Sequence, residues 1–318
     1  MPEIGYTLMG EQSSPRQLVD DAVAAERAGF DYAVCSDHYY PWLSEQGHSP
    51  YAWAVLGAVA YATDRMGLMS YVTCPIRRYH PAVVAQKAAT VSLLSEGRFI
   101  LGLGAGENLN EHVVGAWPHV IERHAMFEEA LEIIHALLSG GVLHYSGNYF
   151  EVPEAQLWDV PDLPVPIGVA VSGPDSIDLA ARYADVLVAT EPKADLVAAF
   201  DAAAGPGKPK YGQVPICWGP DEDACRKIAY EQFRWSGLGW PVNAELPGPR
   251  SFASATKSAT IDQVAQEVTC GPDVAKHVEA VRKYFDAGYT HVAVVQVGGE
   301  NQAAFLETAE RELLPALR

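Results

Sequence analysis

The stretch that decides the fold of this chain runs from Arg98 to His112, with the sequence RFILGLGAGENLNEH. Its first part, Phe99 to Leu103, is an apolar run with the length and composition of a buried β-strand. Glycines at alternate positions then allow the backbone to turn tightly. A single carboxylate, Glu107, stands directly after the turn, and the amide of Asn110 follows it.

This stretch has two interpretations. One is structural: the glycines form a turn after a strand, and the asparagines cap the next helix. The other is a cofactor site, because glycines allow close backbone approach and residues just past a strand face the ligand side of α/β folds. The spacing is G-x-G-x-G and no second strand closed by an acidic residue follows, so the dinucleotide-binding fingerprint is excluded.

Composition narrows the class of protein. The chain has 318 residues, 49% hydrophobic and 19% charged, which is enough for a large core. A net charge of −18 argues against nucleic-acid and anionic-membrane partners. The five cysteines include no C-x-x-C pair. The first residues lack the basic and then apolar pattern of a secretory signal, and the apolar run 50–63 is too short to span a bilayer. We therefore expect a soluble cytoplasmic protein with reduced cysteines.

Outward from the glycine stretch, strand patterns alternate with amphipathic helix patterns along the whole chain. Strands are expected at 4–9, 31–35, 66–72, 99–103, 166–171, 185–189, 211–218 and 291–296. Eight strands connected by helices predict one α/β domain over residues 1–318, a (β/α)8 TIM barrel. An open doubly wound sheet is the alternative that strand number alone does not exclude. Two insertions are expected, a hairpin at about 141–152 and a long lid-like loop at about 238–258.

In a barrel, the residues that follow the strands meet on one rim. For this chain they are Asp37, His38 and Trp42; Val72, Thr73 and Cys74; Glu107 and Asn110; Ser172 and Gly173; Thr190 and Lys193.

Each of these candidates also has a structural interpretation. His38 has two interpretations: a catalyst of acid–base chemistry, or a loop histidine that is hydrogen-bonded to the backbone. Trp42 is either core or the wall of an aromatic ligand site, and Glu107 is either a surface carboxylate or a proton donor. The turn at Ser172 and Gly173 is either a phosphate site or an ordinary helix cap. No metal-ligand spacing and no G-x-S-x-G nucleophile motif is present, so we expect no metal.

Three of these loops together resemble the luciferase-like flavin and deazaflavin oxidoreductases. Within them, the chain resembles the branch typified by coenzyme-F420-dependent glucose-6-phosphate dehydrogenase. The motifs that carry the resemblance are Ser36-Asp37-His38-x3-Trp42, Arg78–Gln86 (RYHPAVVAQ) and Gly104–Glu111 (GAGENLNE). The pair Trp117-Pro118, the Ser172-Gly173-Pro174 turn and the final helix, 305–317, agree with it.

The resemblance implies a TIM barrel with coenzyme F420 lying across its carboxyl-terminal mouth. It assigns catalysis to His38, Trp42 and Glu107. It also implies a bulge after the third strand with a non-proline cis peptide at Tyr71-Val72, which supports the deazaflavin ring. The positions implied to bind the cofactor are Asp37, Tyr71, Val72, Thr73, Cys74, Ala105, Gly106 and Asn110, with Ser172, Gly173, Asp175 and Ser176 at its phosphate.

The implied reaction is hydride transfer between the deazaflavin and a small organic substrate. His38 would take the proton of a substrate hydroxyl, Glu107 would protonate the ring nitrogen, and Trp42 would exclude water. Alternatives are a flavin-mononucleotide monooxygenase of the same superfamily and a cofactor-binding protein without turnover. By analogy with the family, a homodimer is expected.

The substrate half departs from the resemblance. Thr190 and Lys193 match two sugar-phosphate positions, and Lys257 is a candidate for a further lysine. Glu267, however, stands where the family has an arginine of the phosphate pocket. Because a carboxylate facing a phosphate is unfavourable, another alcohol, a ketone or an activated alkene is as good a candidate as glucose 6-phosphate.

Overall fold

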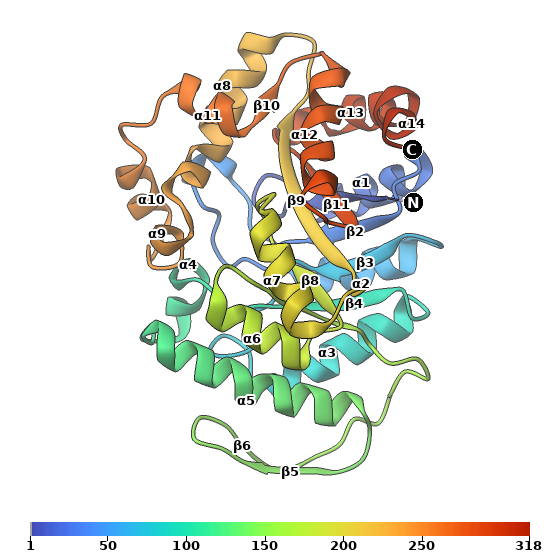
Figure 1. Ribbon diagram of the computed structural model, residues 1–318, viewed down its shortest axis with the longest axis vertical. Coiled ribbons are helices and arrows are strands. Elements are labelled where there is room, and N and C mark those ends of the chain that lie inside the picture. Colours follow the sequence, from blue (N-terminus) through green and yellow to red (C-terminus); the bar gives the residue numbers. More distant parts are fainter. Residues whose placement is uncertain (1) are drawn as a thin grey trace.

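A closed ring of eight parallel strands forms the centre of the computed structural model, which describes residues 2–318 (Figure 1). Neighbouring strands pair in the order β9-β11-β1-β2-β3-β4-β7-β8, and β8 pairs with β9 to close the ring. This closure confirms the predicted TIM barrel and excludes the open sheet. The strands are β1 Glu3–Leu8, β2 Tyr32–Cys35, β3 Gly67–Ser70, β4 Phe99–Leu103, β7 Ile167–Ala170, β8 Val186–Val188, β9 Lys210–Cys217 and β11 His291–Gln296.

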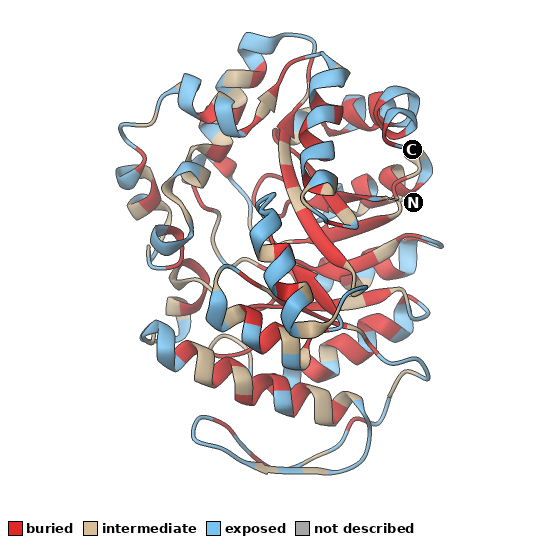
Figure 2. Cartoon of the chain, viewed as in Figure 1, coloured by how far each residue is buried: buried red, intermediate tan, exposed pale blue. Residues whose placement is uncertain are grey.

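Helices surround the ring and bury one face each against it (Figure 2). The longer ones are α1 Pro15–Ala28, α2 Ala52–Ala62, α3 Pro81–Leu94, α5 Val120–Leu138, α6 Pro174–Tyr183, α7 Ala194–Ala204, α8 Glu222–Phe233 and α12 Val274–Asp286. The chain closes with α13 Gln302–Thr308, a π-helical turn Ala309–Leu313 and α14 Leu314–Leu317. Among residues 2–318, no helix is long and apolar enough to cross a membrane.

Local sequence signals set several of these boundaries. Ser14 caps α1 by accepting a hydrogen bond from the Gln17 amide at 3.4 Å, and Pro15 occupies the first helical position. Gly29 ends the helix with a φ of 99°, a conformation that glycine adopts without strain. Residues within a few positions of each helix end therefore set both boundaries of α1.

The glycine stretch is required for the barrel wall to close. A side chain at Gly102 would place its Cβ 2.0 Å from the carbonyl oxygen of Ser70, and Ser70 Oγ donates to the Gly102 carbonyl at 3.0 Å. The backbones of β3 and β4 therefore approach each other more closely than any side chain at position 102 would permit.

The segment expected to be a long loop is ordered and partly helical, which corrects that prediction. It contains α9 Trp240–Asn243 and α10 Pro249–Ala255, and Phe252 is fully buried. Tertiary packing onto the barrel rim forms these helices where the local periodicity is weak. The predicted hairpin is present as β5 Leu143–Ser146 and β6 Glu151–Ala155, and it extends three residues further than expected.

Some elements were not expected from the sequence. They are the short α4 Asn108–Glu111, α11 Ile261–Glu267 and β10 Thr269–Cys270, which pairs with the end of β9 outside the ring. The expected third strand 66–72 is shorter and ends at Ser70, and the closing helix is interrupted by the π-helical turn. The short elements α4, α9 and α10 gather on one side of the molecule, the left in Figure 1.

Candidate active site

A carboxylate–imidazole pair lies where β1 and β2 end. Glu11 Oε1 lies 3.0 Å from His38 Nδ1, and both side chains are nearly buried, 2% and 11% exposed. Glu11 Oε2 accepts a hydrogen bond from Ser36 Oγ at 2.7 Å, which holds the carboxylate in place. The carboxylate favours a proton on Nδ1, so Nε2 is the nitrogen left to exchange a proton with a ligand.

Trp42 lies at the centre of an aromatic cluster beside this pair. The His38 ring meets it edge-on with centroids 5.0 Å apart. Trp235 stacks on it at 4.1 Å and 8°, and Phe252 of α10 meets it edge-on at 5.1 Å. Trp42 is only 5% exposed, so this cluster excludes water from the neighbourhood of His38.

Glu107 is tied to the His38 loop through Asn110. The Asn110 amide nitrogen donates to Glu107 Oε2 at 3.3 Å, and its Oδ1 accepts from the Tyr39 backbone amide at 2.8 Å. Asn110 is 1% exposed, whereas Glu107 is half-buried at the start of α4. The structure thus brings Glu107, Asn110 and the residue after His38 into one hydrogen-bonded group.

The same short helix holds two further segments. The Asn108 amide donates to the Ala244 carbonyl at 2.9 Å, and its side chain donates to the Glu245 carbonyl at 2.8 Å. On the other side, Glu111 Oε2 accepts from the Arg78 backbone amide at 2.7 Å. Burial raises the pKa of Glu111 to about 7, although Arg78 acts in the opposite direction.

The carboxylate of Asp37 is fully engaged by protein donors. It accepts hydrogen bonds from Thr73 Oγ1 at 2.7 Å, Arg78 Nη2 at 3.0 Å, Trp53 Nε1 at 3.1 Å and the Tyr79 hydroxyl at 3.1 Å. With its side chain fully buried, Asp37 fixes the loop that carries His38.

The peptide bond between Tyr71 and Val72 is cis, as the resemblance implied. The Tyr71 hydroxyl donates to the Ala189 carbonyl at 2.8 Å, inside the barrel. Val72 lies against the glycine loop, where a Cβ at Gly104 would meet its Cγ2 at 2.8 Å.

Thr73 and Cys74 continue this contact. The Thr73 carbonyl accepts from the Gly104 amide at 3.0 Å. Gly106 has a φ of 82°, and a Cβ there would lie 2.4 Å from Cys74 Sγ. Burial raises the pKa of the Cys74 thiol. Residues 72–74 therefore pack against the loop 104–106, and Val72, Ala105 and Gly106 remain partly exposed beside Glu107.

The expected phosphate turn is present, but its backbone amides already donate to a side chain of the same turn. Ser176 Oγ accepts from the backbone amides of Ser172 and Gly173 at 3.0 and 3.1 Å. Asp175 is exposed, with its carboxylate 4.0 Å from His124 Nδ1. Within residues 2–318, no hydrogen bond or ion pair joins this turn to His38 or Glu107.

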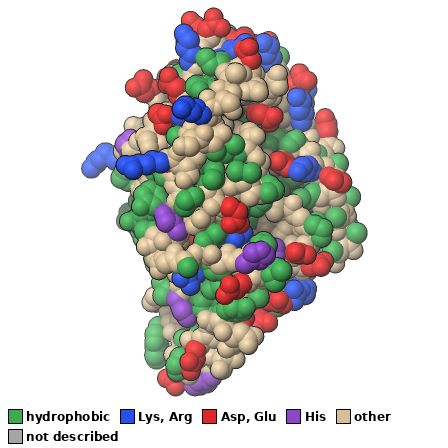
Figure 3. All heavy atoms as spheres, turned by 90° about the vertical axis from the view of Figure 1, so that its left-hand side faces the viewer, with side chains coloured by type: hydrophobic (Ala, Val, Ile, Leu, Met, Phe, Trp, Pro, Cys, Tyr) green, Lys and Arg blue, Asp and Glu red, His purple; other side chains and the backbone are tan. Residues whose placement is uncertain are grey.

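The expected substrate positions carry acidic neighbours, and within residues 2–318 no hydrogen bond or ion pair joins them to His38 or Glu107. Thr190 is exposed and its carbonyl accepts from the Tyr284 hydroxyl at 2.8 Å. Lys193 is paired with Glu191, and Glu267 is exposed at the end of α11. Figure 3 shows the face that carries α9 and α10, where acidic and histidine side chains lie among apolar ones.

Sequence reasoning missed three residues that the structure places in the group: Glu11, Trp235 and Phe252. Glu11 follows the first strand, so the rule applied to the other strand ends would have found it. Phe252 gave no such signal, because the segment 238–258 lacks a regular pattern. Trp235 lies at the end of a helix pattern, far in sequence from any strand end.

The fold and this rim define a class: a TIM-barrel protein whose candidate chemistry lies at the carboxyl ends of its strands. The profile of the luciferase-like monooxygenase family matches residues 2–291, and the chain belongs to this family.

Relatives within the family resemble the chain over its full length. The F420-dependent glucose-6-phosphate dehydrogenase of Segniliparus rotundus is 36% identical over 331 residues, covering 99% of this chain and 98% of that one. The protein of the same name from Beutenbergia cavernae is 36% identical over 333 residues, covering 100% and 98%. These relatives confirm the predicted resemblance.

The solved structure of an F420-dependent secondary alcohol dehydrogenase, in complex with an F420-acetone adduct, superposes with a TM-score of 0.91. It is 28% identical and covers 100% of this chain and 99% of its own. The F420-dependent tetrahydromethanopterin reductase of Methanopyrus kandleri shares the fold, with a TM-score of 0.76 at 19% identity over 100% of this chain and 99% of that one.

Proposed function

We propose that this protein is a coenzyme-F420-dependent oxidoreductase that interconverts a small uncharged alcohol and its carbonyl compound. The observation that carries the proposal is the group of His38, Trp42 and Glu107, fixed by Glu11 and Asn110. The F420-dependent relatives and structural neighbour support the cofactor.

The side chains have distinct tasks in this reaction. F420, when bound, supplies a carrier that takes or gives a hydride. In the oxidising direction, His38 accepts the proton of the substrate hydroxyl at Nε2, and Glu11 stabilises the imidazolium that results. Glu107 would hold a proton beside the cofactor ring, and Trp42 would keep the reacting edge dry.

The partly exposed edge of residues 72–74 and 104–106 suits a flat aromatic ring. Gly106 brings backbone close to a ligand, and Val72 and Ala105 offer small apolar side chains, while Thr73 and Cys74 support this edge from beneath. We assign the cofactor ring to this edge together with Asn110. We assign to Asp37 and Tyr71 the role of holding the loops around the ring in position. The turn at Ser172, Gly173, Asp175 and Ser176 is assigned to the cofactor phosphate, which would compete with Ser176 Oγ for the two amides.

The substrate that fits this rim is uncharged. Lys193 is already paired with Glu191, and Glu267 adds a second carboxylate where a phosphate would need cations. A sugar phosphate would therefore be repelled, whereas a secondary alcohol or ketone, which carries no charge, would not. The similar structure of an F420-dependent secondary alcohol dehydrogenase supports an uncharged alcohol or ketone as the substrate.

Two measurements test the proposal. Tryptophan fluorescence of the purified protein is titrated with F420 and with flavin mononucleotide, and we expect tight binding of F420 only. Binding of flavin mononucleotide alone would favour the monooxygenase alternative. A screen of secondary alcohols, ketones, activated alkenes and glucose 6-phosphate then follows the visible absorbance of the deazaflavin.

We expect turnover with an uncharged alcohol or ketone and none with glucose 6-phosphate; the reverse would refute the substrate class. The variants His38→Ala and Glu107→Ala should lose turnover and retain F420 binding. F420 binding without turnover of any substrate would favour the non-catalytic alternative. A homodimer in solution and a cytoplasmic location also remain predictions, and light scattering of the purified protein checks the first.

A further inference from the structure

Three of the five cysteines meet at the end of β9, and the proposed reaction uses none of them. Cys217 is the last residue of β9, Cys270 is the last residue of β10, and Cys225 lies on α8. The three side chains belong to one buried cluster and are 0%, 8% and 2% exposed. Within residues 2–318, no group of three Cys, His, Asp or Glu side chains has the arrangement of a metal site.

Cys217 and Cys270 are directly paired in register across two parallel strands. Strands in a sheet lie about 4.8 Å apart, which falls within the roughly 4.4–6.8 Å between Cα atoms that a disulfide spans. The Gly271 amide donates to the Cys217 carbonyl at 3.0 Å, which fixes this register. The two residues therefore need little backbone movement to form a disulfide.

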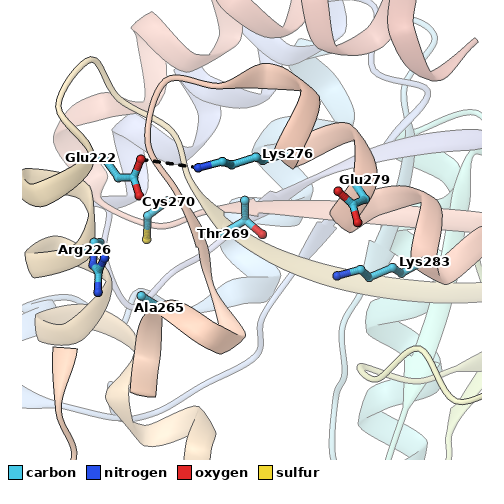
Figure 4. Close-up of a pocket in the computed structure, with 8 residues that line it drawn as sticks. All are labelled: Glu222, Arg226, Ala265, Thr269, Cys270, Lys276, Glu279 and Lys283. Atoms are coloured by element: carbon cyan, nitrogen blue, oxygen red, sulfur yellow. Dashed lines mark ion pairs between the residues drawn. The ribbon is translucent and has the colours of Figure 1, made fainter. Parts of the chain in front are cut away.

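Cys270 lines a cavity that neither Cys217 nor Cys225 lines. The cavity has a volume of about 240 Å³, and its charged walls are Glu222, Arg226, Lys276, Glu279 and Lys283. Figure 4 shows the Cys270 side chain between Glu222 and Arg226. Lys276 Nζ lies 3.6 Å from Glu222 Oε2, so both signs of charge stand close to the thiol.

The same neighbours make Cys270 the thiol that ionises more readily. The adjacent Cys217 thiol and the positive charge of Arg226 lower the pKa of Cys270, although burial and Glu222 act in the opposite direction. Cys217 stays protonated, because its neighbouring thiols and burial raise its pKa and its Sγ donates to the Val297 carbonyl at 3.3 Å. Burial raises the pKa of Cys35 and of Cys74, and neither lines this cavity. The thiolate that attacks a small molecule thus forms where a small molecule has room to enter.

We propose that Cys270 is a thiol–disulfide exchange site for a small disulfide of amino-acid type, and that Cys217 resolves the mixed disulfide. Cys270 thiolate attacks one sulfur of the small disulfide, a protein–ligand S–S bond forms, and one small thiolate leaves. Cys217 then attacks Cys270 Sγ, so a Cys217–Cys270 bond forms, and its proton passes to the second small thiolate as that thiolate leaves through the cavity. The two protein thiols are oxidised and the small disulfide is reduced to two thiols.

The charges in the cavity select the ligand. A disulfide that carries ammonium and carboxylate groups meets acids in Glu222 and Glu279 and cations in Arg226, Lys276 and Lys283. The bond that results would join the two ends of the segment 218–269. That segment carries Trp235 and Phe252, which pack on Trp42.

The test uses the native full chain and cystine as the probe. Aliquots are quenched in acid, remaining thiols are alkylated under denaturing conditions, and peptides are mapped by mass spectrometry. We expect a cysteine adduct on Cys270 first and a Cys217–Cys270 linked peptide later, with Cys35 and Cys74 unmodified. The uncharged probe hydroxyethyl disulfide should react about two- to fivefold more slowly, the factor that one exposed ion pair provides.

Variants separate the two roles and provide a control. C217S should stop at the Cys270 adduct, C270S should leave Cys217 unmodified, and C225S should still form the Cys217–Cys270 link. Earlier modification of another cysteine, a Cys217–Cys225 link or no reaction of native protein with cystine would overturn the proposal. Equal rates for the two probes would overturn the selection by charge. The site-resolved rates of the unsubstituted chain decide the matter even if a variant folds poorly.

Discussion

Among single residues, the pair of Glu11 and His38 has a counterpart at the opposite end of the barrel. Glu3 Oε2 lies 3.1 Å from His291 Nε2, and these residues stand at the start of β1 and β11. Both pairs join a carboxylate to an imidazole, but only Glu11 and His38 lie beside Trp42 and Glu107. Position on the barrel, and not the pair itself, distinguishes the candidate catalytic group.

This comparison supplies a matched test of Glu11 as a positioning residue. Glu11→Gln keeps the size of the side chain but removes the charge that orients His38 and stabilises its protonated form. We expect kcat to fall by about 10- to 100-fold while KM and F420 affinity change less than about twofold. Glu3→Gln should leave all three unchanged. A fall in F420 affinity that matches the fall in kcat would show that Glu11 acts on binding instead.

Glu111 makes stability depend on pH. Burial raises its folded pKa from 4.5 to about 7, so the folded state favours the protonated carboxyl. Its contribution to stability is therefore complete below pH 4.5 and is lost as the pH rises through 7. Between about pH 5 and 8 the free energy of unfolding should decrease by about 2–3 kcal/mol from this residue.

Urea unfolding at both pH values measures that decrease. Glu111→Gln should flatten the dependence while retaining a carbonyl to accept from the Arg78 amide. Asp21, whose pKa burial raises to about 6, acts in the same direction and accounts for the part of the slope that remains. An unchanged slope in Glu111→Gln would contradict the assignment.

Among elements, the four-residue helix α4 has an influence beyond its length. Its residues bond to the His38 loop through Asn110, to the Arg78 loop through Glu111 and to the segment after α9 through Asn108. The last contact links the glycine loop to the segment that covers Trp42. Movement of that segment and the position of Glu107 are therefore coupled through one helix.

Removing one of these bonds should release one segment. Asn108→Ala deletes the side-chain bond to the Glu245 carbonyl, which is worth about 1 kcal/mol or about fivefold in local opening. We expect hydrogen exchange across Trp240–Ala255 to accelerate by that factor, while the barrel strands stay protected. Asn148→Ala, at the exposed hairpin turn, should change nothing there. Faster exchange of the strands as well would indicate global destabilisation in place of a local release.

At the scale of the whole molecule, closure of the barrel depends on the approach of β3 to β4. Gly102→Ala would place a Cβ 2.0 Å from the Ser70 carbonyl, and two paired strands cannot separate locally without opening the ring. We expect a loss of at least about 3 kcal/mol in the free energy of unfolding. Gly237→Ala, where nothing lies within 4 Å, should cost less than about 0.5 kcal/mol. Urea unfolding of both variants decides, and equal stability would show that the strands adapt.

The candidate site was partly predictable for an identifiable reason. His38, Glu107 and Asn110 follow predicted strands, and in a closed barrel all strand ends face one rim. The aromatic cover on Trp42 was not predictable, since Trp235 and Phe252 lie about two hundred residues further along the chain and neither follows a strand of the barrel. The engagement of Asp37 by four donors was equally hidden, because those donors come from three separate parts of the sequence.

The sequence by itself determined the alternation of strands and helices, their main caps and the glycine turn, because these depend on residues within a few positions of one another. Only the tertiary structure decided that Glu11 holds His38, that α9 and α10 form over Trp42, and that Cys217 lies opposite Cys270. Such contacts arise when the ring closes and residues remote in the chain exclude water together. No local pattern carries that information.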